Sequence, residues 1–157
     1  MTPAALAAAI VAALLVAFPH WPARGERARA TAEARVAVIL AACDREGASR
    51  AECIATASEC YVESGLRMRH PGSSFCGCQP YDTDDATQAR CAVRSVMRAR
   101  RECGAPDAAS THYIDGRCAL PWWTAPRWRG LVAAHVGQAR RVRAALAAAI
   151  GDVTCAR

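Results

Sequence analysis

The chain has 157 residues, of which 53% are apolar and 22% are charged. This composition excludes a disordered or collagen-like chain and leaves enough apolar residues for one core. The net charge is +6, and all 20 basic residues are Arg. Because the complete absence of Lys is typical of codon bias in a GC-rich genome, the Arg excess carries little functional weight. A basic chain is still attracted to polyanions, which include nucleic acid, anionic lipid and acidic cell-wall polymers.

An apolar run of Ala, Leu and Val residues covers residues 4–18. It is shorter than the roughly 20 residues that a membrane span requires. We therefore expect residues 1–23 to be a signal peptide or a short N-terminal membrane anchor. The protein is then extracytoplasmic, either periplasmic or secreted, with membrane attachment through residues 4–18 if the segment is not cleaved. The alternative is a buried N-terminal helix.

Apolar residues recur at steps of three and four along most of the remaining chain, which is typical of amphipathic helices. Ser49 and Glu52 form a capping box that begins one of them, and Gly47 and Gly65 are stop signals. A long loop is expected over 65–81, since it contains Pro and Gly without a sustained period. No segment alternates as a strand does. The expected helices are 26–46, 50–64, one from Asp82–Asp85 to Gly104, and 127–150. The sequence thus predicts a mainly α single domain over 26–157 with four to six helices.

The nine cysteines indicate either disulfides or a metal site, and they argue against an ordinary reduced cytosolic protein. A zinc site could be assembled from Cys76 and Cys78 with His70, Cys91, Cys103 and His112, but no paired Cys-x2-Cys spacing supports it. Disulfides are therefore preferred, and the sequence assigns no connectivity. Cys53 and Cys60 are unlikely partners, because two turns of one helix separate them by roughly 10 Å.

Glu63 is the strongest candidate for chemistry. It lies at the end of the helix predicted over 50–64, where a negative charge is disfavoured, so this position is expected to raise its pKa. A raised pKa suits a general acid, which must hold its proton until the leaving oxygen needs it. The alternative is an ordinary exposed Glu. His135 lies on the apolar stripe of the last helix and is interpreted as a core or boundary residue.

Three ordered motifs resemble the transglycosylase SLT domain of the lysozyme-like superfamily. They are the helix end 63–67, the loop 76–80 and the segment 112–116. In that family a Glu-Ser pair ends a helix, a Gly-Leu-Met-Gln loop follows, and a Tyr-Asn-x-Gly motif comes later. Cys76 stands where the family has Gly, unless Gly77 serves one place later. In the same motifs Cys78 replaces Met and Ile114 replaces Asn.

The resemblance implies a lysozyme-like fold and a peptidoglycan lytic transglycosylase that cleaves the bond between N-acetylmuramic acid and N-acetylglucosamine. Glu63 matches the catalytic acid, Ser64 its partner in the motif, Gln79 the motif glutamine, and Tyr113 the tyrosine that contacts the reacting sugar. The last three are taken as substrate-binding residues. The implied partners are peptidoglycan glycan strands, and the implied protein is monomeric, with no cofactor, metal or nucleic acid.

Two alternatives remain open. A hydrolytic lysozyme requires a second carboxylate, for which Asp82, Asp84 and Asp85 are candidates, although helix capping explains them more simply. A protein of another class, a non-catalytic disulfide-stapled cell-wall-binding or structural protein, would keep the shape without turnover. The aromatic residues Trp122, Trp123 and Trp128 are expected to cap the core rather than to stack on sugars.

Overall fold

The structure is a computed structural model that describes residues 2–21, 25–66, 75–78, 83–104, 112, 116–119 and 125–150. Over these residues the chain forms helices and no strands. The helices are α1 (Pro3–Ala17), α2 (Glu26–Glu46), α3 (Arg50–Ser64), α4 (Asp85–Cys103) and α6 (Pro126–Ile150). The prediction of a mainly α fold is therefore confirmed, with helix bounds close to those expected from the sequence.

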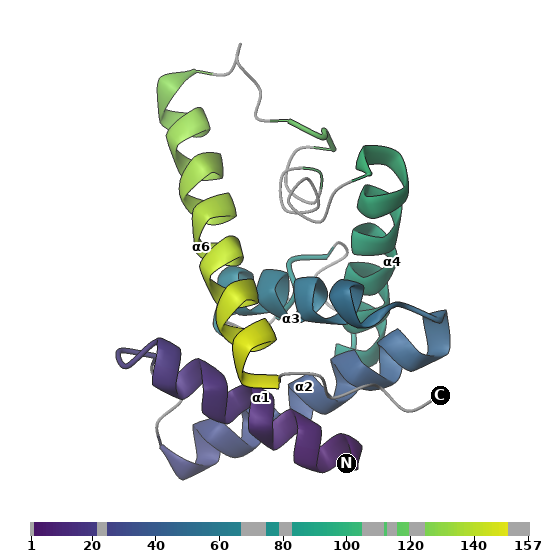
Figure 1. Cartoon of the computed structure of the whole chain (residues 1–157), viewed down its shortest axis with the longest axis vertical. Helices are drawn as coiled ribbons and strands as arrows, with labels where there is room; N and C mark the ends of the chain where they lie inside the picture. Colours follow the sequence, from purple (N-terminus) through teal and green to yellow (C-terminus); the bar gives the residue numbers. More distant parts are fainter. Residues whose placement is uncertain are drawn as a thin grey trace.

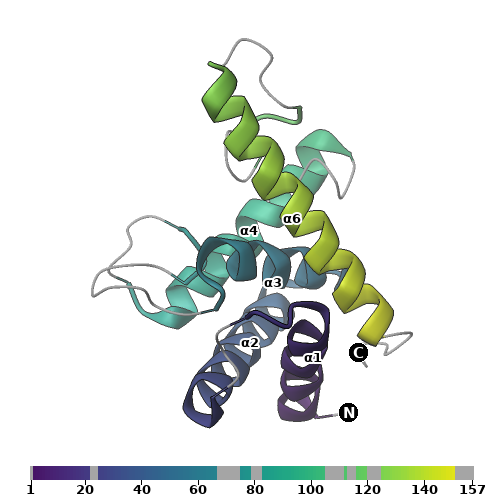
Figure 2. The ribbon, with the colours of Figure 1, turned by 90° about the vertical axis from the view of Figure 1, so that its left-hand side faces the viewer.

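Helix α3 occupies the centre of the molecule, and α4 and α6 rise on its two sides (Figure 1). Helices α1 and α2 lie side by side beneath it (Figure 2). Helix α2 packs against α1, α3 and α4, and α6 packs against α1 and α3. Each peripheral helix thus contributes to one core that surrounds α3.

Local signals in the sequence set the helix ends. The Ser49 hydroxyl accepts a hydrogen bond from the Glu52 backbone, and the Glu52 carboxylate accepts one from the Ser49 N–H, so the predicted capping box is present. Asp84 caps α4 by accepting a hydrogen bond from the Thr87 backbone. Gly47 ends α2 in the left-handed conformation, as predicted.

Helix α3 is buried on nearly every side. Ala57, Ser58 and Tyr61 are buried, and Thr56 and Glu59 on other faces are fully buried as well. Several faces are covered because α2, α4 and α6 all pack against α3. Its small Ala, Ser, Thr and Cys side chains allow those neighbours to approach closely.

Helix α1 packs onto the body through buried Ala, Ile, Val and Leu side chains. Trp21, just beyond it, is 4% exposed and contacts the Tyr61 ring edge-on at 5.2 Å between centroids. Within the described part of the chain, no helix has the length and apolar character to cross a membrane. Export and cleavage of residues 1–23 stay predictions.

Helix α6 contacts the body only through its later turns. Val136, Val142 and Leu146 are buried, whereas residues 125–131 are exposed. Leu131 is 60% exposed and Trp128 is 51% exposed, so the prediction that Trp128 caps the core is wrong. The stripe continues at helical spacing, but the first turns of α6 extend past α3 (Figure 1). Trp122 and Trp123 lie outside the described residues.

Three disulfides are present among the described residues: Cys60–Cys76, Cys78–Cys91 and Cys103–Cys118. The preference for disulfides over a zinc site is confirmed, since Cys76, Cys78 and Cys91 are all cross-linked. Cys53 and Cys60 are not partners, as expected. Three disulfides in one small domain are typical of an oxidising, extracytoplasmic environment.

Candidate functional site

Glu63 occupies the last turn of α3, and the chain leaves the helix immediately after it. Gly65 adopts φ +62° and its N–H donates to the Tyr61 carbonyl, which ends the helix. Leu66 also has a positive φ, of 57°, which costs a branched residue energy and therefore needs support from its surroundings. Its side chain is fully buried, and its carbonyl accepts a hydrogen bond of 2.8 Å from Arg35.

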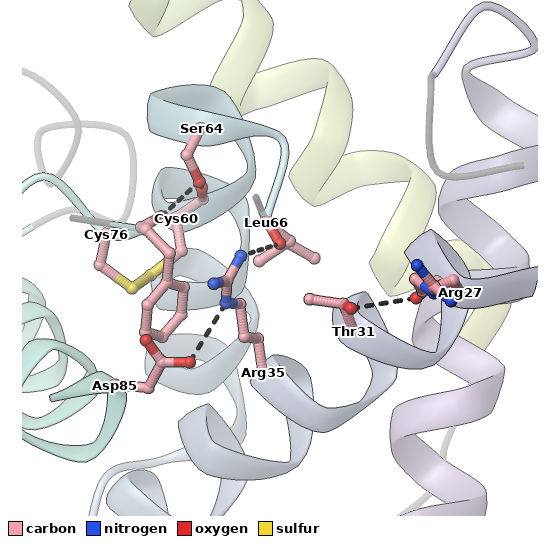
Figure 3. Close-up of polar contacts among 9 residues, drawn as sticks. Arg27, Thr31, Arg35, Cys60, Ser64, Leu66, Cys76 and Asp85 are labelled. Atoms are coloured by element: carbon pink, nitrogen blue, oxygen red, sulfur yellow. Dashed lines mark hydrogen bonds and ion pairs between the residues drawn. A yellow bond between two sulfur atoms is a disulfide. The ribbon is translucent and has the colours of Figure 1, made fainter. Parts of the chain in front are cut away.

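Arg35 connects three elements beneath this helix end (Figure 3). It reaches from α2 to the Leu66 carbonyl and to the Asp85 carboxylate at 3.2 Å, and its guanidinium lies 5.3 Å from the centre of the Phe75 ring. Only 10% of its side chain is exposed. Because the planar guanidinium donates in several directions at once, one residue fixes the end of α3, the start of α4 and the loop around Phe75.

Residues 75–78 are held against the end of α3. The Ser64 hydroxyl lies 2.7 Å from the Phe75 carbonyl and 3.2 Å from the Cys60 carbonyl (Figure 3). The Cys60–Cys76 disulfide joins the same two segments, and Cys78–Cys91 ties the loop to α4. This segment is therefore cross-linked on both sides of Gly77.

Gly77 lies directly against the Glu63 side chain. A Cβ atom built at Gly77 would come within 2.9 Å of the Glu63 Cγ and Cδ atoms and 3.0 Å of Oε2. Gly77 also has φ +74°, a conformation that other residues adopt only with strain. Both the backbone angle and the space require glycine. The loop backbone thus forms one wall of the position that the Glu63 carboxyl group occupies.

His135, from α6, also lies near the Glu63 carboxyl group. The His135 Nε2 atom lies 3.0 Å from Oε2 of Glu59 and 3.8 Å from Oε1 of Glu63. Glu59 is one turn before Glu63 on α3, and its side chain is 1% exposed, whereas that of Glu63 is 30% exposed. One imidazole therefore connects a buried carboxyl group with a carboxyl group that solvent reaches.

His135, interpreted from the sequence as a core or boundary residue, lies at the boundary, with 18% of its side chain exposed, and it contacts two carboxyl groups. A histidine on a helix gives no indication in sequence of a partner 76 positions earlier. The signal that could have found it is the spacing of Glu59 and Glu63, which places two carboxylates on one helix face and requires a cation or proton donor nearby.

The other predicted site residues have different outcomes. Ser64 is 2% exposed, and its hydroxyl lies within hydrogen-bonding distance of protein carbonyls, so it connects the helix end to the loop; its contact with substrate stays a prediction. Gln79 and Tyr113 lie outside the described residues.

The aspartates considered as a second carboxylate have structural roles where they are described. Asp84 is the N-cap of α4, and hydrogen bonds from Thr87 hold its pKa below the ordinary value. Asp85 pairs with Arg35. Asp82 lies outside the described residues. Capping and ion pairing thus account for the two aspartates that the structure describes.

A groove of about 360 Å³ lies beside this helix end. Residues 17–21, Tyr61, Val62, Ser64, Gly65 and Gln138 line it, and Glu63 does not. Trp21 closes one side by donating its indole N–H to the Gly65 carbonyl at 3.0 Å. The groove therefore adjoins the end of α3 and does not include Glu63.

Within the described part of the chain, no group of three or more His, Cys, Asp or Glu residues is arranged to hold a metal ion. No protein-family model, curated protein or solved structure matches the chain.

Proposed function

We propose that the protein is a peptidoglycan lytic transglycosylase in which Glu63 is the single general acid and base. The observation that carries this proposal is the close packing of Gly77 against the Glu63 carboxyl group. The SLT motif likewise pairs a Glu at a helix end with a glycine-containing loop. Gly77 then takes the place of the motif glycine, one position later than in the family pattern.

The disulfides support the same assignment. In the motif, the loop after the catalytic Glu presents a glutamine, here Gln79. Cys76 and Cys78 replace motif residues and are cross-linked to α3 and α4. Cross-links on both sides of Gly77 restrict how this segment moves relative to Glu63. A catalytic carboxyl group gains from such restriction, because its rate depends on sub-ångström placement.

The reaction needs one proton donor and no water. Glu63 protonates the glycosidic oxygen as positive charge develops at the anomeric carbon of N-acetylmuramic acid. Its carboxylate then removes the proton from the 6-hydroxyl of the same sugar, whose oxygen closes the anhydro ring. The proton returns to Glu63, so the enzyme is regenerated when the ring closes.

His135 lies near the carboxyl groups of both Glu59 and Glu63, and we propose that it supports Glu63 as the acid. Glu59 is buried and in contact with His135, so it is not accessible to a sugar. It therefore does not serve as the second carboxylate that a hydrolytic lysozyme uses on the opposite side of the substrate. This arrangement favours the single-acid reaction over hydrolysis.

The test is lysis of purified peptidoglycan by the oxidised full-length protein, the Glu63→Gln variant and the Glu33→Gln variant. Glu33 lies on α2 and pairs with Arg29 at the surface, so its replacement is a matched control. We expect Glu63→Gln to lose turnover by a factor of 100 or more, roughly the contribution of a positioned acid, while Glu33→Gln is unchanged. Equal lysis by all three proteins would contradict the proposal.

A folded, disulfide-bonded wild-type protein that binds peptidoglycan without releasing any product would instead identify the non-catalytic cell-wall-binding protein. Circular dichroism and the count of alkylated cysteines establish folding in each sample, so a misfolded preparation is not mistaken for an inactive one.

A further inference from the structure

Two cysteines outside the three disulfides lie together at the turn between α2 and α3. Cys43 is in the last turn of α2, Cys53 is in the first turn of α3, and both are buried. The Cys43 thiol hydrogen-bonds to the Cys53 sulfur, which lowers the pKa of Cys53. The Cys53 thiol also donates to the Ala48 carbonyl at 3.9 Å, within the turn that joins the two helices.

The backbone of the intervening turn holds this arrangement from both ends. The Gly47 N–H donates to the Asp44 carbonyl and the Ala48 N–H donates to the Cys43 carbonyl at 2.9 Å, which closes α2. The Ser49 capping box begins α3 one residue later. Arg100 of α4 also donates to the Ser49 hydroxyl, at 2.6 Å. The two helix ends, and with them the two cysteines, are fixed relative to each other.

We propose that Cys43 and Cys53 form a fourth disulfide, which staples the α2–α3 turn in the mature protein. The geometry supports it, because Ala48 in the turn contacts both residues: its N–H donates to the Cys43 carbonyl at 2.9 Å, and its carbonyl accepts from the Cys53 thiol at 3.9 Å. The three disulfides elsewhere in the chain show that thiols at bonding distance are oxidised in the environment for which this protein is built.

The oxidant is another disulfide, either a small-molecule disulfide such as oxidised glutathione or the disulfide of a protein thiol oxidase. The Cys53 thiolate attacks one of its sulfur atoms, forming a mixed disulfide and releasing one thiol. The Cys43 thiolate then attacks Cys53 and releases the second thiol. Two protein thiols are oxidised, the oxidant is reduced to two thiols, and the protons lost from the cysteines go to the thiols that leave.

Access to the pair is set by helix α1. Cys53 lines an apolar cavity of about 20 Å³ together with Leu6 and Ile10 of α1 and Leu146 of α6. An oxidant therefore reaches Cys53 before α1 and α6 have closed over it, or when they open locally. We expect the disulfide to form during folding rather than in the completed fold.

The test counts thiols in the full-length protein. The protein is folded with oxidised and reduced glutathione, unfolded in guanidinium with an alkylating reagent present, and analysed by intact mass spectrometry and trypsin digestion. The tryptic peptide 36–45 contains Cys43 alone, and the peptide 144–157 contains Cys155 alone. Four disulfides leave one alkylated cysteine, Cys155. Peptide 36–45 then appears only joined to peptide 51–67, which contains Cys53 and Cys60 and is itself linked to peptides 70–90 and 91–94 by the other disulfides.

Two variants keep the result unambiguous. Cys155→Ser is expected to lower the alkylated count from one to zero, and Cys53→Ser is expected to raise it from one to two with peptide 36–45 alkylated. Three alkylated cysteines in the wild type, with the other three disulfides intact, would overturn the proposal. A disulfide from Cys155 to Cys43 or Cys53 in place of the proposed one would overturn it as well.

Discussion

Replacing Gly77 with Ala tests whether the loop positions the Glu63 carboxyl group. The added Cβ would lie 2.9 Å from the Glu63 Cδ atom, whereas ordinary contacts are 3.4–4 Å, so the carboxyl group must move by about 0.5 Å or more. Since a displacement of about 1 Å at a reacting group costs about 100-fold in rate, we expect Gly77→Ala to lose roughly 10-fold or more in peptidoglycan turnover.

The matched control is Gly104→Ala. Gly104 has φ +73°, almost the same as Gly77, but a Cβ there meets no atom of the residues that the structure describes within 4 Å. Both variants therefore carry the backbone strain of a left-handed alanine, about 1 kcal/mol. Only Gly77→Ala adds the overlap with Glu63, which costs about 1–3 kcal/mol more if the structure does not relax.

The assay is the release of soluble muropeptides from sacculi, measured well below the melting temperature of each variant. Gly104→Ala is expected to lose stability and keep its rate per folded molecule, while Gly77→Ala loses both. If the two variants turn over peptidoglycan equally fast, the loop does not position Glu63 and the reasoning from the close contact is wrong.

Three further predictions concern the frame around the site. Arg35→Ala should cost about 2 kcal/mol or more in urea unfolding, because it removes the charged hydrogen bond to the buried Leu66 carbonyl and the one to the Asp85 carboxylate; an unchanged midpoint would contradict this. Replacing Cys78 and Cys91 by Ser should cost about 3 kcal/mol and lower turnover; full activity in reducing agent would show the cross-link to be dispensable. The hydrogen bond from Arg94 lowers the pKa of Glu46, so the ionised Glu46 stabilises the fold above its ordinary pKa of 4.5. This stabilisation is lost on acidification, when Glu46 takes up a proton. The Tm of the wild type should therefore fall more steeply below that pH than the Tm of Glu46→Gln.

The helix ends could be predicted from sequence because their causes are local. The capping box at Ser49 involves residues three positions apart, and the Asp84 cap likewise bonds within its own turn. Such interactions depend on short stretches of chain whose geometry each helix terminus fixes. For the same reason Glu63 could be placed at a helix end without any knowledge of the tertiary fold.

The surroundings of Glu63 could not be predicted in the same way. His135 lies 76 positions from Glu59 in sequence, and only the packing of α6 on α3 brings the two together. The apolar stripe of α6 indicated a core-facing side and correctly placed His135 inward, but it contained no information about which helix it would meet. Disulfide pairing was open for the same reason, since eight cysteines allow many connectivities.

More of α3 is buried than its periodic pattern of apolar residues predicts. The spacing of apolar residues at steps of three and four does not mark small polar residues of this helix, such as Thr56, as buried. In the fold, Thr56 and Ser58 donate to carbonyls one turn earlier and are buried without cost in unpaired groups. Small polar side chains that bond to their own helix are therefore compatible with a fully buried position.

The most direct measurement is digestion of peptidoglycan in water labelled with heavy oxygen, followed by mass spectrometry of the released muropeptides. If Glu63 acts alone and the sugar's own hydroxyl closes the ring, the products are anhydro sugars that carry no label, and Glu63→Gln releases none. Labelled reducing ends would show that water attacks the anomeric carbon, which contradicts the single-acid mechanism and identifies a hydrolase.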